Sequence, residues 1–430
     1  MRHTPIPPEL FIENRQRLRA LLPPGSLAIV NANDIPPTNA DGSLVGVPNS
    51  DLFHLTGVEQ EESLLVLCPD AHEEKHREIL FLRETNDHIA VWEGHKLTKE
   101  EARRTTGIQT VMWLHDFPAI QRVLMCQADV VYLNSNEHAR AGVQVQTRDA
   151  RFIRETQESF PLHRYERLAR LMHRLRPVKS KPEVDLIREA CGITREGFLR
   201  VLKFVKPGVN ECGVEAEFAH EFIRRRGRFA YNPIIASGAN SNVLHYLEND
   251  KPCRRGEVLL LDVGAAYANY AADMTRTIPV SGKFSRRQKQ IYQAVLRVMR
   301  GCIAALRPGI LPRDWQRHAE LLMQEELLQL GLIAPKDVKK QDPDRPALKK
   351  YFMHGVGHPL GLDVHDVATI GQPIEAGWVM TVEPGIYLPE EGFGIRLEND
   401  VLVTTSGPVD LMADIPVEAA EIEDLMGQGR

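Results

Sequence analysis

The chain of 430 residues has a formal net charge of −5 and an isoelectric point near 6.4. A chain of this length can bury two cores, so two domains are expected, and its lysines and arginines are too evenly spread to favour nucleic acid or an anionic membrane. Six cysteines lack the spacing of a zinc ribbon or a disulfide framework. With no signal peptide and no window near the roughly 20 apolar residues of a membrane span, the sequence predicts a cytoplasmic protein.

The first part of the chain, to about residue 170, alternates short apolar runs with helical patches. Strands are predicted within residues 25–33, 63–69, 78–84 and 129–135, because each is a short apolar run rich in Val, Ile and Leu. This pattern indicates an α/β domain over residues 1–176. A fresh helix is predicted after the boundary, with Pro182 near its first turn.

The second part, residues 177–430, contains a weak internal repeat. Residues 205–227 resemble residues 306–331: in each, a basic residue, Pro and Gly form a turn, and a helix closed by Gly follows. Each copy then continues into apolar strands. A duplicated domain is therefore predicted, with a site at the junction of its halves.

Acidic residues end the apolar strands of both copies, and a histidine-rich loop lies between them. Buried acids need a partner, and four carboxylates in one crevice repel each other unless cations neutralise them. One imidazole among oxygen ligands favours Mn, Co, Fe or Zn over Ca or Mg. We therefore predict two divalent ions, a centre suited to hydrolysis. The candidate ligands are Asp262, Asp273, His358, Glu383 and Glu398.

The loop "HGVGHPLGLDVHD" at 354–366 is too rich in Gly and Pro for a helix. His358 is assigned to the metals, whereas His354 and His365 are predicted to face the substrate as donors to an oxyanion. His245 precedes Asp262 much as His358 precedes Glu383, and Arg396 shares a strand face with Glu398, which it could orient.

Each acid also has a structural interpretation when it is taken alone. Asp262 could cap a helix, Asp273 could form an ion pair and Glu383 could belong to a turn. Glu398 could be a solvated loop acid. Trp92 is most often part of a core or an edge cover.

Four segments together resemble the metallopeptidases of the pita-bread fold, and among them the Xaa-Pro aminopeptidases. They are "LLLDVGAAYANYAADMTRTIPVSGKF", "HGVGHPLGLDVHD", "MTVEPGIYL" and "GIRLENDVLVT". Residues 47–67, "VPNSDLFHLTGVEQEESLLVL", are similar to the creatinase-like N-terminal domain of that family. The resemblance implies an α/β (α+β) protein with a creatinase-like domain over 1–176 and a pita-bread catalytic domain over 177–430.

The resemblance also implies particular roles for the site residues. The same five ligands would hold two ions, usually Mn2+, with Glu383 handling the proton and His354 and His365 stabilising the intermediate or holding the proline side. The substrate-binding residues would be His245, Arg396 paired with Asp41, and Trp92 lent by a neighbouring subunit, with Tyr231 behind the metals. A homo-oligomer, dimer or tetramer, and peptide substrates that begin Xaa-Pro are expected.

Several functions remain open at this point. A prolidase, which cleaves Xaa-Pro dipeptides, would use the same metals and the same loop. A methionine aminopeptidase leaves the N-terminal domain unexplained, and a creatinase or a non-catalytic binding relative usually loses ligands. The motif at 47–54 also departs from the bacterial pattern at Val47, Pro48, Phe53 and His54, so the outer subsites follow less directly from the family.

Overall fold

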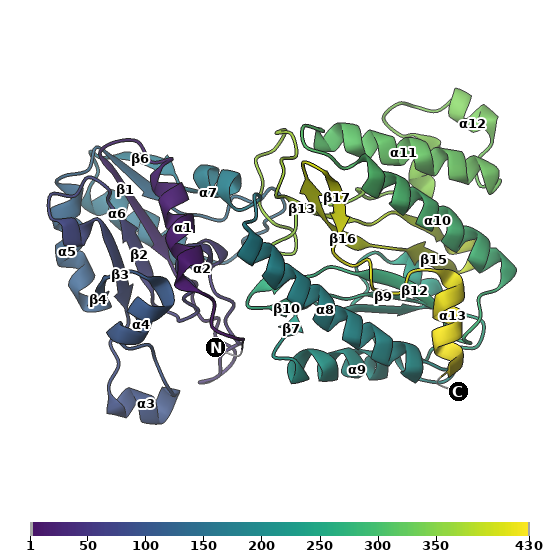
Figure 1. Ribbon diagram of the computed structural model, residues 1–430, viewed down its shortest axis with the longest axis horizontal. Coiled ribbons are helices and arrows are strands. Elements are labelled where there is room, and N and C mark those ends of the chain that lie inside the picture. Colours follow the sequence, from purple (N-terminus) through teal and green to yellow (C-terminus); the bar gives the residue numbers. More distant parts are fainter. Residues whose placement is uncertain (1–2, 429–430) are drawn as a thin grey trace. The chain divides into compact units, whose positions relative to one another are not determined.

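The computed structural model describes residues 3–428, which divide into two compact units with the division after Arg176 (Figure 1). The first unit is built on a mixed sheet of order β4-β3-β2-β1-β5-β6. Strands β1–β5, β3–β4 and β5–β6 pair in parallel, while β1–β2 and β2–β3 are antiparallel. The strands are β1 (Ser26–Asn31), β2 (Leu64–Leu67), β3 (Glu78–Leu82), β4 (Thr110–Trp113), β5 (Val130–Leu133) and β6 (Arg164–Arg167).

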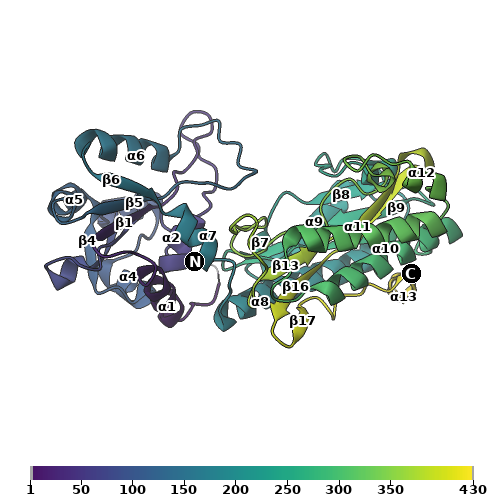
Figure 2. The same ribbon diagram turned by 90° about the horizontal axis from the view of Figure 1, so that it is seen from above.

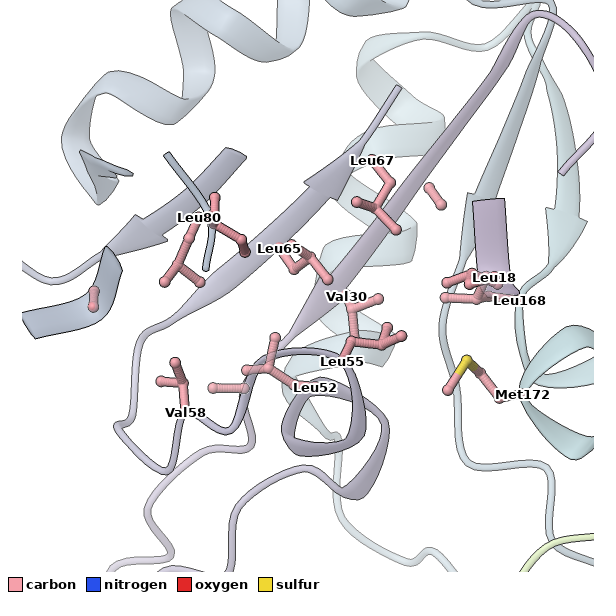
Figure 3. Close-up of a cluster of buried hydrophobic side chains, with 14 of the residues drawn as sticks. Leu18, Val30, Leu52, Leu55, Val58, Leu65, Leu67, Leu80, Leu168 and Met172 are labelled. Carbon is pink, nitrogen blue, oxygen red and sulfur yellow. The ribbon is translucent and has the colours of Figure 1, made fainter. Parts of the chain in front are cut away.

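Helices cover both faces of this sheet, because successive strand residues point to opposite sides. Val30 packs in a core with Leu18, Leu52 and Met172, whereas its neighbour Ile29 packs in the opposite core with Phe117. Figure 3 shows the first of these cores, and Figure 2 shows α6 on one side of the strands and α1 and α4 on the other. The helices are α1 (Pro8–Arg19), α2 (Ser50–Thr56), α3 (Asp87–Glu93), α4 (Lys99–Thr106), α5 (Phe117–Met125), α6 (Arg148–Ser159) and α7 (Ala169–Leu175).

The second unit repeats one arrangement twice, a pair of helices followed by an antiparallel sheet (Figure 1). The first half contains α8 (Lys181–Phe204), α9 (Glu211–Arg224), β7 (Arg228–Phe229), β8 (Ile234–Ser237), β9 (Val258–Asp262), β10 (Ala265–Tyr267), β11 (Tyr270–Ala271) and β12 (Thr275–Pro279). The second half contains α10 (Arg286–Ala305), α11 (Pro312–Gln329), α12 (Pro335–Lys339), β13 (Val379–Val382), β14 (Gly385–Leu388), β15 (Phe393–Arg396), β16 (Asn399–Thr404) and β17 (Gly407–Asp410). Helix α13 (Ala419–Gln428) follows.

The two halves match in backbone detail as well as in element order. The turn before the second helix of each half has a left-handed glycine, Gly208 with φ 95° and Gly309 with φ 89°. The predicted glycine closure of that helix holds in the second half, where Gly331 has φ 67°. In the first half the prediction is wrong, because Arg226 rather than Gly227 takes the left-handed conformation, with φ 66°.

Local signals set the ends of the long helices. Ser180 and Glu183 form a capping box that starts α8, with Pro182 in the first turn. Among the helices of residues 3–428, none combines the length and the apolar character that a membrane span requires. All six cysteines lie in the described part of the chain and are free.

Candidate active site

The acidic candidates occupy equivalent places in the two halves of the second unit. Asp262 ends β9 and Glu383 follows β13. Asp273 lies two residues before β12, which pairs with β9, and Glu398 lies immediately before β16, which pairs with β13. Beyond the two strand ends, the Val263 amide donates to the Met274 carbonyl at 2.9 Å, and the Leu397 amide donates to the Pro384 carbonyl at 3.3 Å. The repeated hairpin therefore places two acids per half on neighbouring strands.

The histidine loop lies against β13 because it contains a glycine at the point of closest approach. A Cβ on Gly357 would lie 2.0 Å from the Thr381 carbonyl oxygen, so no larger residue fits without a shift. On either side of this contact, the His358 amide donates to Thr381 Oγ1 at 3.0 Å, and the Thr381 amide donates to the His358 carbonyl at 2.9 Å. These bonds fix His358 beside the acids.

The predicted ligands lie near one another in the second unit. His358 Nε2 lies 3.5 Å from Asp273 Oδ2 and 3.7 Å from Glu383 Oε1. Tyr231, the residue expected behind the metals, has its hydroxyl 2.7 Å from Asp262 Oδ1 and 2.5 Å from Asp273 Oδ1. Ligand atoms of Asp273, His358 and Glu398 lie within 4.8 Å of one another, a geometry that can hold a metal ion.

The ring of His358 is oriented as a metal ligand requires. Its Nδ1 lies 3.0 Å from the Pro359 carbonyl, to which it donates, so Nε2 points toward the acids, where the neutral ring could bind a cation. Burial opposes the charged ring, but contacts with Asp273 and Glu383 raise the pKa of His358 to about 9.

The acids carry the mutual repulsion that the sequence predicted. Burial, together with Asp273, Glu383 and Asp262, raises the pKa of Glu398 well above its ordinary value. Burial likewise raises the pKa of Glu383 to about 7 and raises that of Asp262. Divalent cations would relieve this repulsion, and the set of four carboxylates and one imidazole fits such ions.

The structural interpretations of these acids are largely excluded. Glu398 is only 2 % exposed and accepts from Thr275 Oγ1 at 2.7 Å, so it is not a solvated loop acid. Asp262 accepts from Tyr231 and Arg396 rather than from the start of a helix. The neighbouring Arg276 is buried and donates only to carbonyl groups in its recorded hydrogen bonds, so it is not the ion-pair partner of Asp273.

Arg396 bonds directly to Asp262 and reaches Glu398 through one intermediate side chain. Its Nη2 donates to Asp262 Oδ2 at 2.5 Å and its Nη1 donates to the Tyr387 hydroxyl at 2.8 Å. Arg396 is linked to Glu398 through Thr275, whose Oγ1 accepts from Arg396 Nε at 3.2 Å and donates to Glu398 at 2.7 Å. The bond to Asp262 follows from the β14–β15 hairpin, which pairs Gly385 with Arg396 and directs the guanidinium toward the first half. Tyr387 was not predicted, because hairpin register cannot be read from residue spacing.

The predicted substrate-facing histidines lie close to the ligands. Both ring nitrogens of His354 have partners: Nδ1 donates to the Gly355 carbonyl and Nε2 accepts from the Tyr387 hydroxyl, each at 2.8 Å. Burial and the Arg396 charge lower the pKa of His354 to about 3, so its ring is neutral. Donation to an oxyanion therefore requires one of these bonds to be exchanged, and it stays a prediction.

His365 stacks on the ring of His358, with centroids 3.9 Å apart and planes inclined by 22°. His245 lies on an exposed loop, and its charge contributes to the lowered pKa of His354, which places the two rings in electrostatic contact. The second unit thus places His354 and His365 close to the predicted ligands, while the place of His245 in the site stays a prediction.

Two predicted substrate-binding residues belong to the first unit. Asp41 is exposed, and its pairing with Arg396 stays a prediction. Trp92 is 77 % exposed on α3, a helix without a buried residue, so the interpretation of Trp92 as a core residue is wrong. Its predicted contact with a neighbouring subunit is untested.

Comparison with known proteins gives the family. Residues 185–405 match metallopeptidase family M24, and residues 11–132 match the N-terminal domain of aminopeptidase P. The chain is 34 % identical to an Xaa-Pro aminopeptidase of Escherichia coli strain K12 over 98 % of each chain. It is 31 % identical to human Xaa-Pro aminopeptidase 3, covering 92 % of this chain and 78 % of that protein.

Solved structures agree with the sequence matches. Aminopeptidase P of E. coli with the inhibitor Pro-Leu superposes with a TM-score of 0.88 at 31 % identity, covering 99 % of this chain and 100 % of the other. Aminopeptidase PepP of Pseudomonas aeruginosa gives a TM-score of 0.88 at 30 % identity, with 99 % of each chain covered. The fold is that of the aminopeptidase P structures, and the site offers a geometry that can hold a metal ion. The chain belongs to metallopeptidase family M24, and the predicted resemblance and α/β fold class are confirmed.

Proposed function

We propose that this chain is a metallo-aminopeptidase that removes the N-terminal residue from peptides with proline in the second position. The observation that carries the proposal is the match to Xaa-Pro aminopeptidases over nearly the full length of both chains. The grouping of Asp273, His358 and Glu398 in a geometry that can hold a metal ion supports it, with Glu383 close to His358. A creatinase or a binding relative would not need this set. A methionine aminopeptidase would not account for the matched N-terminal domain.

The ligands Asp262, Asp273, His358, Glu383 and Glu398 would hold two divalent ions, for which we propose Mn2+, with Co2+, Zn2+ and Fe2+ as alternatives. When bound, such ions supply Lewis acidity for activating water and polarising the scissile carbonyl. Arg396 and Tyr231 hold the carboxylates of Asp262 and Asp273 in the orientation that binding needs.

Proton transfer is assigned to Glu383. A carboxylate at this place can accept a proton at one step and release it at the next. Its Oε2 lies 3.8 Å from His354 Nδ1, on the side of the cluster where we place the substrate. Glu383 would take a proton from the attacking water and return it to the leaving amine nitrogen of proline.

Substrate contacts are assigned to the histidines around this carboxylate. We propose that His354 and His365 stabilise the tetrahedral intermediate or hold the proline ring, and that His245 meets the peptide near the scissile bond. Arg396 with Asp41, and Trp92 of a neighbouring subunit, are proposed to contribute to substrate binding in a dimer or tetramer. We also propose a cytoplasmic location, because all six cysteines are free thiols.

A prolidase is the second candidate, because it would use the same metals on the same loop. Turnover of an Xaa-Pro dipeptide should be compared with turnover of an Xaa-Pro-Xaa tripeptide, each with and without Mn2+. Release of the first residue from the tripeptide only when Mn2+ is present supports the aminopeptidase. Cleavage restricted to the dipeptide would favour the prolidase, and no cleavage of either peptide would refute both.

A further inference from the structure

His245 lies on a loop whose two ends are tied down while its tip is exposed. The loop runs over residues 238–250 and begins with a short 3-10 helix, Gly238–Asn242. His245 is exposed, yet its neighbour Tyr246 is 6 % exposed and Asn249 is 4 % exposed. The loop is therefore anchored immediately beside His245, the histidine proposed to meet the substrate.

The anchor is the carboxylate of Glu211, which is fully buried in the first turn of α9. Oε1 accepts from the Ser237 amide at 2.8 Å and from the Ser237 hydroxyl at 2.6 Å, before the loop. Oε2 accepts from the Tyr246 hydroxyl within the loop at 2.8 Å and from the Lys251 amide just after the loop at 3.0 Å. One side chain thus connects both ends of the loop and the residue next to His245.

The chemistry of these bonds requires a carboxylate. Both oxygens of Glu211 accept bonds, and an amide in its place would turn an NH2 group toward backbone amides that can only donate. A buried donor left without an acceptor costs about 1–3 kcal/mol, so the loop would move to satisfy it. Glu211 also gains from the positive N-terminal end of α9.

A second side chain of α9 also bonds to the loop, and α11 makes a corresponding contact with the His354 loop in the second half. Glu215 lies seven residues after the turn glycine Gly208 and accepts from Asn249 Nδ2 at 2.9 Å. Gln316 lies seven residues after Gly309 and accepts from the Val356 amide at 2.7 Å, within the His354 loop. In each half the second helix holds the loop that carries a substrate-facing histidine.

The loop is also connected to the rest of the site. The Gly394 amide of β15 donates to Ser241 Oγ at 2.8 Å, and Gly394 lies two residues before Arg396. A Cβ on Gly394 would lie 2.5 Å from the Ser241 carbonyl, so loop and strand are in close contact. Displacement of the loop would therefore move His245 relative to the strand that carries Arg396.

We propose that Glu211 is a positioning residue for His245: its buried carboxylate fixes residues 238–250 so that the His245 ring is held toward the peptide substrate. This inference rests on the proposed function. The hydrogen bonds of Glu211 go to Ser237, Asn240, Tyr246 and Lys251 and to none of the five proposed ligands, so we expect its effect on turnover to pass through the loop that carries His245.

The test is a double-mutant cycle of Glu211→Gln with His245→Ala, with turnover of an Xaa-Pro-Xaa tripeptide measured under saturating Mn2+. Glu211→Gln alone should lower kcat/KM by about 10- to 100-fold, the scale of a misplaced active-site group. In the His245→Ala background the same change should cost less than about twofold, because the positioned group is already absent. Tyr246→Phe, which removes one of the four short bonds, should give a smaller loss of the same kind.

Glu326→Gln is the matched control. It makes the same change at a buried carboxylate of α11, which pairs with Arg297 away from the site, and it should leave kcat/KM within about twofold. Calorimetric binding of Mn2+ alone should be unchanged in Glu211→Gln. An equal loss of kcat/KM in both His245 backgrounds, or a loss of Mn2+ binding, would overturn the positioning role.

Hydrogen exchange tests the same inference without turnover. In the Glu211→Gln variant the amides of Ser237 and Lys251 should exchange at least about tenfold faster, while amides of β9 keep their protection. Unchanged exchange at both amides refutes the inference. If the wild-type protein cleaves no Xaa-Pro peptide, the proposed function fails, and the exchange result still decides whether Glu211 fixes the loop.

Discussion

Arg396 and Asp262 form a buried ion pair that joins the two halves of the second unit, with Nη2 and Oδ2 2.5 Å apart. The arginine lies on β15 of the second half and the aspartate ends β9 of the first. The same guanidinium donates to Tyr387, whose hydroxyl donates to His354. Asp262, a proposed metal ligand, and His354, a proposed substrate contact, therefore share one hydrogen-bonded chain. A change at Arg396 should therefore affect metal binding and turnover together.

Arg396→Lys should weaken Mn2+ binding and lower kcat by about 100-fold or more, because an ammonium cannot reproduce the planar two-point donation of a guanidinium. Calorimetry with Mn2+ and tripeptide turnover measure the two effects. Arg297→Lys, at an ion pair with Glu326 on α10 and α11, is the matched control and should change neither. Full turnover in the Arg396→Lys variant would contradict the role given to this pair.

Alanine substitutions of Glu383 and His365 should have different effects on Mn2+ binding. Glu383→Ala should abolish turnover and weaken Mn2+ binding, because it removes a ligand and the proton carrier together. His365→Ala should leave Mn2+ binding intact and lower turnover by about 100-fold, since the ring stacks on His358 without being one of the five ligands. Equal loss of metal in both variants would show that His365 supports the metal site itself.

The convergence of acids in the second unit was predictable from the sequence for a physical reason, whereas the role of these acids as metal ligands stays a prediction. Asp262 and Glu383 end apolar strands, and an acid at such a position needs a charged or hydrogen-bonding partner. The duplication then predicted that two acids from each half would converge. Strand positions in the first unit were similarly visible, because short apolar runs such as the one containing Ile29 have few alternatives to a buried strand.

The contacts that orient the ligands were not predictable. Tyr387 reaches His354 and Arg396 reaches Asp262 only because β14 and β15 pair in one register, and no spacing rule encodes that register. Arg276 likewise donates to carbonyl groups of residues as distant as Pro416, a set of partners that its neighbours in the sequence do not indicate. Long-range packing of this kind is absent from local sequence patterns.

Gly357→Ala should disrupt the metal site, whereas Gly355→Ala two residues earlier should be tolerated. The new Cβ at 357 would meet the Thr381 carbonyl at 2.0 Å, while at 355 the nearest atom is Gln316 Oε1 at 3.8 Å. We expect Gly357→Ala to lower the free energy of unfolding by about 1–3 kcal/mol and to weaken Mn2+ binding through His358. Denaturant unfolding and calorimetry on the pair provide the measurement, and equal behaviour of the two variants would contradict the close packing of this loop on β13.

Bound Mn2+ should stabilise the protein against unfolding, and loss of the Glu398 carboxylate should remove most of this stabilisation. At a Mn2+ concentration of 100 times Kd, the free energy of unfolding should rise by about 2.7 kcal/mol, and a chelator should reverse the gain. Glu398→Gln should lose most of this metal-dependent rise in Tm. Without metal, however, the Glu398→Gln protein should be at least as stable as the wild type, because the repulsion of Glu398 by Asp273, Glu383 and Asp262 is removed.

Glu423→Gln, at a largely buried carboxylate paired with Lys289 on α10, is the control and should keep the full response to Mn2+. A metal-free Glu398→Gln protein that unfolds well below the wild type would mean that Glu398 stabilises the fold through its bond to Thr275 more than it destabilises the fold through repulsion.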